Sequence, residues 1–121
     1  MGSLSLVEIA YVAGLYEGEG TVGSYRRENG TRTLRLKIRM TNIEPLQYTK
    51  YIFGSHGFLR GPYLSPNSLG TKPVYEFDVT RFESIQMIIA AIWEWLSSER
   101  QTQARRALLD YHQSYDRKME I

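Results

Sequence analysis

Hydrophobic and polar residues divide this chain into segments with two different periods. Between Leu4 and Leu15 the apolar residues recur every three or four positions, which is typical of an α-helix. Over residues 33–41 the pattern becomes a strict alternation, which predicts a half-buried β-strand. Its apolar positions are Leu34, Leu36, Ile38 and Met40, and its polar positions are Thr33, Arg35, Lys37, Arg39 and Thr41.

The other segments predict an α+β fold with the order α-β-β-α-β-β-α-α. The expected strands lie over 21–26, over 58–63 with a stop at Gly61-Pro62, and over 74–80. One expected helix opens at residues 42–45 and ends at Gly54, another starts at Arg81 or Phe82 and runs to Leu96, and a final helix runs from about Thr102 to Tyr115. A polar loop over 65–70 joins the last two strands, and Ser97-Ser98 is expected to end the apolar helix before the final one. In the strand over 74–80, Tyr75, Phe77 and Val79 face one way and Glu76, Asp78 and Thr80 the other.

Composition sets limits on the class of protein. With 121 residues, 42% of them hydrophobic and 23% charged, the chain is expected to form one globular, soluble domain over 1–121. No apolar run reaches the ~20 residues that a membrane span needs. The absence of cysteine excludes disulfides and thiolate metal sites, and it fits a reducing cytoplasm, which is the expected location.

Charge is distributed unevenly along the chain. Residues 1–20 carry three acids and no bases, residues 21–50 carry seven bases and two acids, and the remainder carries eight of each. A negative spot directly followed by a positive strand favours an enzyme that cleaves phosphodiester bonds.

The end of the first helix combines small residues with acids. Ala10, Gly14 and Gly18 recur every four residues, with Ala13 beside Gly14, so one helix face is bare enough for another backbone to approach. Glu17 and Glu19 follow at the helix C-terminus, where the helix dipole disfavours negative charge, and Gly18 and Gly20 would allow a sharp turn. Two such helices packed together would gather their acids around a divalent cation. The alternative is a buried helix that ends in solvated acids.

Residues 12–20, Val-Ala-Gly-Leu-Tyr-Glu-Gly-Glu-Gly, resemble the signature of the LAGLIDADG homing endonucleases, and the predicted element order agrees with that family. The resemblance implies a curved antiparallel sheet shaped like a saddle, with its concave face in the DNA major groove and helices on the convex face. Because the chain carries a single signature, it also implies a homodimer, with Ala10, Ala13, Gly14 and Gly18 at the two-fold seam. Glu17 is expected to tie down the helix end or that seam.

The resemblance further implies a site-specific endonuclease that makes metal-dependent double-strand breaks in a long, near-palindromic target and serves the mobility of an intron or intein. Glu19 stands where the family binds its catalytic metal, expected here to be Mg²⁺, with the backbone carbonyl of Gly18 as a second ligand. Asn42 resembles the polar position that holds active-site water, and a helix cap is its other expected role. Arg100 stands for the family's basic residue, but arginine is a poor proton shuttle.

Double-stranded DNA is therefore the expected partner, and the polar faces of the strands are the expected contact. Arginine and lysine can pair with guanine, and acids can accept from cytosine N4. The opposing interpretation is an ordinary solvated face of a half-buried sheet. The DNA-binding candidates are Gly23, Tyr25, Arg27, Arg35, Lys37, Arg39, Arg60, Glu76, Asp78 and Thr80.

Two other functions remain open at the level of sequence. One is a catalytically silent member of the same fold that binds DNA or intron RNA, as a regulator or a splicing maturase. Glu17 and Glu19 argue against it, because a pure binder gains nothing from anions beside phosphates. The other is a small-molecule or protein-interaction domain with a similar glycine-rich helix end, against which the cationic strand argues.

Overall fold

The computed structural model describes residues 4–64 and 72–119, so the predicted polar loop at 65–70 lies outside the described residues. The predicted order of elements is confirmed. It is α1 (Leu6–Glu19), β1 (Gly20–Arg26), β2 (Arg32–Met40), α2 (Glu44–Phe53), β3 (Phe58–Tyr63), β4 (Val74–Val79), α3 (Phe82–Ile92) and α4 (Ser98–Met119), with 3-10 turns η1 (Gly54–His56) and η2 (Trp93–Trp95). Among these described elements, no helix has the length and apolar character needed to cross a bilayer.

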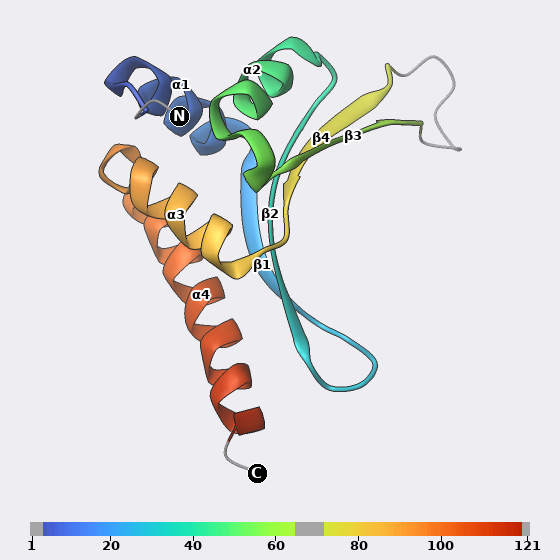
Figure 1. Ribbon diagram of the computed structural model, residues 1–121, viewed down its shortest axis with the longest axis vertical. Coiled ribbons are helices and arrows are strands. Elements are labelled where there is room, and N and C mark those ends of the chain that lie inside the picture. The colour runs from blue at the N-terminus through green and yellow to red at the C-terminus, as the bar shows by residue number, and fades with distance from the viewer. Residues whose placement is uncertain (1–3, 65–71, 120–121) are drawn as a thin grey trace.

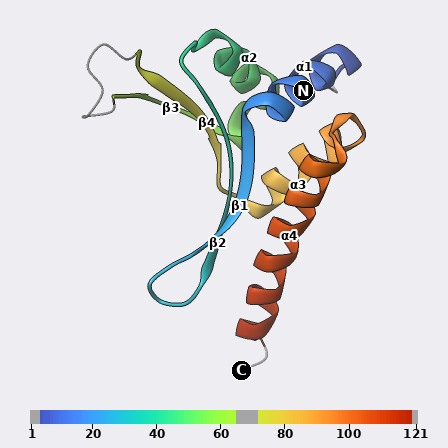
Figure 2. The ribbon, with the colours of Figure 1, turned by 180° about the vertical axis from the view of Figure 1, so that it is seen from behind.

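The four described strands form one antiparallel sheet in the order β1-β2-β4-β3. The β1-β2 hairpin and the β3-β4 hairpin extend in different directions, so the sheet is curved (Figure 1). The helices lie on its convex side, and from behind α4 runs beside β1 (Figure 2). The predicted α+β saddle, with helices on the convex face, is confirmed.

The strand register separates the two faces of the sheet. Leu36 lies opposite Val79, and Ile38 lies opposite Phe77, and all four side chains are almost completely buried. These residues pack against an apolar side of α3 made of Ile85, Ile88, Ile89 and Ile92. The alternation in β2 therefore places one set of side chains in the core and the charged set on the concave face.

The last helix differs from its predicted range. It begins at Ser98 rather than about Thr102 and continues to Met119 rather than Tyr115. Ser97 lies in the predicted break after Leu96, directly before the first residue of α4, and it also caps that helix. Its hydroxyl accepts a hydrogen bond from the backbone N–H of Arg100 at 3.3 Å, and its carbonyl accepts from that of Gln101 at 2.9 Å.

Gly20 is required for packing and not for the predicted sharp turn. Its φ of −89° is extended backbone, so α1 continues directly into β1. A Cβ at this position would collide with the ring of Tyr16, which is completely buried. The Tyr16 hydroxyl forms no hydrogen bond with any described residue. Burial raises the pKa of this hydroxyl to about 12. A bare backbone at Gly20 thus lets a large aromatic ring fill the space under the helix end.

Candidate functional site

Glu19 is the last residue of α1, and its carboxylate is exposed. Within the described part of the chain it has no hydrogen-bond or ion-pair partner. The carbonyl of Gly18 belongs to the same helix end, where backbone carbonyls carry the negative pole of the helix dipole. Carboxylate and carbonyl oxygens in a negative potential are the donor set that a hard divalent cation prefers.

One copy of the chain supplies only part of a metal site. The described residues contain no group of three or more His, Cys, Asp or Glu side chains that could hold a metal ion. Glu19 and Gly18 therefore fit a cation only if other oxygen ligands come from water, from phosphate or from a second copy.

Glu17 is the other acid of this helix end, and both of its carboxylate oxygens accept hydrogen bonds from the same chain. Its Oε1 accepts from the backbone N–H of Ser97 at 2.8 Å, and its Oε2 accepts from the Ser97 hydroxyl at 2.7 Å. The bond from the backbone N–H is the main reason why the pKa of Glu17 lies below its ordinary value. Of the two roles expected for Glu17, the structure supports the tie at the helix end, which joins α1 to the start of α4.

Arg100 reaches the same helix end from the first turn of α4. Its Nε donates to the carbonyl oxygen of Glu17 at 3.1 Å, and its Nη1 donates to Gln103 Oε1 at 3.0 Å. Its guanidinium carbon lies 5.8 Å from the centroid of the Tyr16 ring. These contacts hold a permanent positive charge at the end of the helix that carries Glu19.

Asn42 lies at this end of the sheet as well. Gly20 pairs with Ile38, and β2 continues past that pair, so Asn42 follows the strand beyond the start of β1. Its Oδ1 accepts from the backbone N–H of Glu44 at 3.1 Å, although Ile43 is the residue that caps α2. The expected capping role is thus met from the position just before the cap.

The concave face gathers the expected DNA-contacting residues in rows across the strands. Gly23 lies opposite Arg35, and Tyr25 lies opposite Thr33. Lys37 lies opposite Asp78, and Arg39 lies opposite Glu76, which itself lies opposite Arg60. Arg27 and Thr80 are exposed just outside the strands.

The two acids on this face are buried, and the sequence predicted them to face outward. Asp78 is 0% exposed and Glu76 is 7% exposed. Asp78 Oδ2 lies 2.5 Å from Arg35 Nη2 and 2.9 Å from Arg60 Nε. Glu76 Oε2 lies 3.2 Å from Arg39 Nε and 4.0 Å from Lys37 Nζ. Arg35, Lys37 and Arg39 have no acid between them in sequence, but the neighbouring strand supplies Asp78 to Arg35 and Glu76 to the other two.

The arginines of this face differ in which guanidinium nitrogens their ion pairs use. Arg35 directs both Nε and Nη2 toward Asp78, and this contact is the main reason why its pKa is raised. Arg60 and Arg39 use only Nε, so no described residue accepts from their terminal nitrogens. Because base recognition uses the terminal nitrogens in pairs, Arg39 and Arg60 are the arginines that are best prepared to contact a ligand.

Sequence reasoning missed two residues of this region. Ser97 holds Glu17, and its signal was a serine followed by Ser98 and Glu99, which is typical of a helix start. Phe58 lies on the concave face opposite Asp78, and its signal was its position two residues before Arg60 in a strand.

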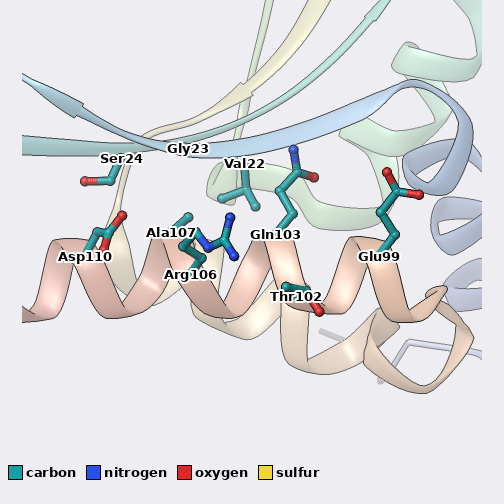
Figure 3. A pocket seen from close by; sticks show the side chains of 9 residues that line it. All are labelled: Val22, Gly23, Ser24, Glu99, Thr102, Gln103, Arg106, Ala107 and Asp110. Atoms are coloured by element: carbon teal, nitrogen blue, oxygen red, sulfur yellow. The ribbon is translucent and has the colours of Figure 1, made fainter.

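A groove of about 360 Å³ lies on the other side of β1, between this strand and α4 (Figure 3). In this view Gln103 extends from α4 toward β1. Two acids and one base line the groove, so its charge does not suit a phosphate backbone. Its lining residues are Val22, Gly23, Ser24, Glu99, Thr102, Gln103, Arg106, Ala107 and Asp110.

The outer face of α1 is open, with one change from the predicted set. Ala13 is 1% exposed and belongs to the core of its own chain, so it lies outside the open stripe. Gly14 and Gly18 are exposed, and a Cβ at either position would meet nothing within 4 Å. With Val7 and Ala10 they form a stripe of small or exposed residues along the helix, which we call the α1 stripe.

Comparison with known proteins identifies the fold. No family model matches the chain, and no curated protein matches it in sequence. The chain resembles the homing endonuclease I-CvuI in complex with its target, with a TM-score of 0.68 and 19% identity over 93% of this chain and 70% of that one. It also resembles the LAGLIDADG meganuclease I-AabMI bound to uncleaved DNA, with a TM-score of 0.71 and 13% identity over 93% of this chain and 39% of that one. A third similar structure is the group I intron-encoded homing endonuclease I-CeuI complexed with DNA. Its TM-score is 0.62, with 13% identity over 87% of this chain and 54% of that one. This chain thus spans about half or less of the latter two.

Replacing Glu17 by Gln should remove part of the acid sensitivity of folding. The pKa of Glu17 is lowered from 4.5 in the folded chain. The stabilisation from its bonds to Ser97 is therefore fully present above pH 4.5 and is lost as the pH falls through the lower folded value. Urea midpoints measured from neutral pH to about pH 3 should fall more for the wild type than for Glu17→Gln. The exposed Glu94→Gln should behave like the wild type, and parallel curves for all three proteins would contradict the assignment.

Proposed function

We propose that this chain, which has the fold of the LAGLIDADG homing endonucleases, is a homodimeric, metal-dependent endonuclease that makes double-strand breaks in a long, near-palindromic DNA target. The observation that carries the proposal is the position of Glu19. Its carboxylate is exposed and has no partner among the described residues. Glu19 directly precedes β1, and the second residue of this strand, Thr21, lies opposite Lys37 of the concave face. An anion gains nothing beside DNA phosphates unless a cation is bound between them.

The concave face would bind double-stranded DNA. It presents four cations against two buried acids, so it attracts phosphates while its ion pairs keep the side chains in place. Arg39 and Arg60, with their terminal nitrogens available, would donate to guanine O6 and N7. Arg35 and Lys37 would contribute mainly through their charge and through the positions of their neighbours. The structures of I-CvuI, I-AabMI and I-CeuI that resemble this chain were all obtained with DNA, which supports this assignment.

Glu19 and the Gly18 carbonyl would hold Mg²⁺. This ion would supply activation of the attacking water and neutralisation of the leaving 3′ oxygen. Arg100, fixed by the Glu17 carbonyl and the Tyr16 ring, would stabilise negative charge on the phosphate, and as a permanent cation it would not transfer a proton. Asn42 would hold solvent with its amide nitrogen while its oxygen stays bound to the Glu44 N–H.

Two copies would pack through the α1 stripe. The stripe is uncharged, and Gly14 and Gly18 leave room for a second helix backbone. A two-fold axis there would bring the same residues of both copies together. Both Glu19 carboxylates would then lie at one end of the paired helices, so the second copy would add its carboxylate to the cation site.

Replacing Glu19 by Gln should abolish cleavage and leave DNA binding intact. Loss of a residue that only hydrogen-bonds to a metal ligand already lowers metal affinity or activity about 10- to 100-fold. Loss of the ligand itself should therefore lower the cleavage rate by at least about 100-fold. Duplex DNA libraries incubated with Mg²⁺ would be sequenced for double-strand breaks, with Glu83→Gln on α3 as a control that cleaves like the wild type. Salt-sensitive binding without cleavage in every protein would favour the silent regulator or maturase instead, with intron RNA as a further ligand to test.

Replacing Gly14 by Arg should give a folded monomer. The new side chain has free space in a single chain, but it would place two guanidinium groups against each other in the dimer. Analytical ultracentrifugation should give twice the chain mass for the wild type and for Ala90→Arg, which adds the same charge to an exposed position of α3. A wild type that sediments as a monomer at every concentration would reject the paired site.

Replacing Asp78 by Asn should make DNA binding stronger but less selective. Arg35 and Arg60 would lose their shared anion and become free to contact phosphates, so the plot of log affinity against log salt should steepen by about one unit. The free energy of unfolding should fall by about 1–3 kcal/mol, because a buried acceptor of charged hydrogen bonds is weakened. Glu83→Gln, with the same charge change away from this face, should leave the slope unchanged. An unchanged slope in Asp78→Asn would show that these arginines do not lie near DNA.

A further inference from the structure

Phe58, the first residue of β3, occupies a charged neighbourhood. It lies opposite Asp78 on the concave face, whereas Leu59 lies opposite Phe77 in the core. The row that crosses the four strands at this level consists of Thr21, Lys37, Asp78 and Phe58, so Phe58 is its one apolar member. The residue is 52% exposed.

Two cations with fixed positions lie near the Phe58 ring. Lys50 Nζ lies 5.9 Å and the Arg60 guanidinium carbon 5.5 Å from the ring centroid. Lys50 is held by hydrogen bonds to the carbonyls of Gly54 and Gly57, at 2.7 and 2.8 Å, and Arg60 is held by Asp78. Both cations are held by contacts other than the ring, so the three side chains form a preformed group with an apolar centre.

A structural role accounts for only one part of this side chain. The ring lies beside the ion pairs of the buried Asp78, and its covered half helps to keep water away from them. The register places this half-exposed residue on the concave face, where the proposed DNA ligand would lie. An isolated exposed apolar side chain is ordinary on a protein surface, but this one lies within a face proposed to enter the major groove.

The edge of the major groove presents one apolar group, the 5-methyl group of thymine. An aromatic side chain that meets this methyl group distinguishes thymine from cytosine without a hydrogen bond. Resting on the proposed DNA-binding function, we propose that Phe58 is a specificity-determining residue that contacts the 5-methyl group of a thymine in each half-site, with Arg60 and Lys50 contacting the DNA beside it.

The test removes single methyl groups from the DNA. A duplex selected by the wild type from a random library would be resynthesised with deoxyuridine in place of one thymine at a time, and affinities would be measured without divalent cations. Loss of one buried methyl contact should weaken wild-type binding about fourfold at one thymine of each half-site. Phe58→Ala should bind thymine and uracil equally at that position, and Tyr51→Ala, which removes an exposed ring from α2, should discriminate like the wild type.

A second measurement does not depend on the folding of a variant. Placing 5-iodo-deoxyuridine at the sensitive position puts a photoreactive atom where the methyl group was, and the crosslink to the wild type should map to the peptide that contains Phe58. A crosslink to another strand, a wild type without any sensitive thymine, or a Phe58→Ala variant with unchanged discrimination would each overturn the inference. Preference for single-stranded DNA with equal binding of thymine and uracil would overturn it as well. Complete absence of salt-sensitive duplex binding would instead reject the proposed function together with this inference.

Discussion

The end of α1 sets the constraint on which the candidate site depends. A helix C-terminus is an unfavourable place for negative charge, and this one carries two glutamates. Glu17 is relieved from within the chain, because Ser97 donates two hydrogen bonds to its carboxylate and Arg100 donates one to its carbonyl. Glu19, two residues later, has no such relief among the described residues. The same contacts that join α1 to α4 therefore leave one carboxylate to be balanced by something outside the chain.

The concave face resolves its own charges differently. Here two acids from β4 lie beneath four cations, so the cations are held in place but not neutralised. Fixing a long side chain before a ligand arrives lowers the entropy lost on binding, and it also limits which partners can be contacted. The buried acids weaken the attraction of this face for any phosphate backbone, but they hold its hydrogen-bond donors in a defined pattern. That pattern suits a protein that must find one site among many.

Local sequence patterns predict most of the fold. Most of the features that they miss depend on contacts between residues far apart in the sequence. The alternation of β2 and the small residues of α1 are local, so the strand faces, the element order and the open helix stripe could be predicted from them. The burial of Asp78 depends on Arg35, 43 positions earlier, and the role of Ser97 depends on Glu17, 80 positions earlier. Glycine permits sharp turns, which is the role that the sequence predicts for Gly20, but it is the ring of Tyr16 that requires it. The two interactions between distant residues leave no periodic signal in the sequence, and the contact of Gly20 with Tyr16 depends on how that ring packs.

The two sides of β1 differ in charge, and this difference decides how a nucleic acid could approach. The groove toward α4 is lined by two acids and one base, whereas the concave face presents four bases and two acids. A polyanion is repelled by the first surface and attracted by the second. Glu19 immediately precedes β1, so it lies at the end of the strand that divides these two surfaces. DNA drawn to the concave face would therefore meet this carboxylate at the border of its binding surface.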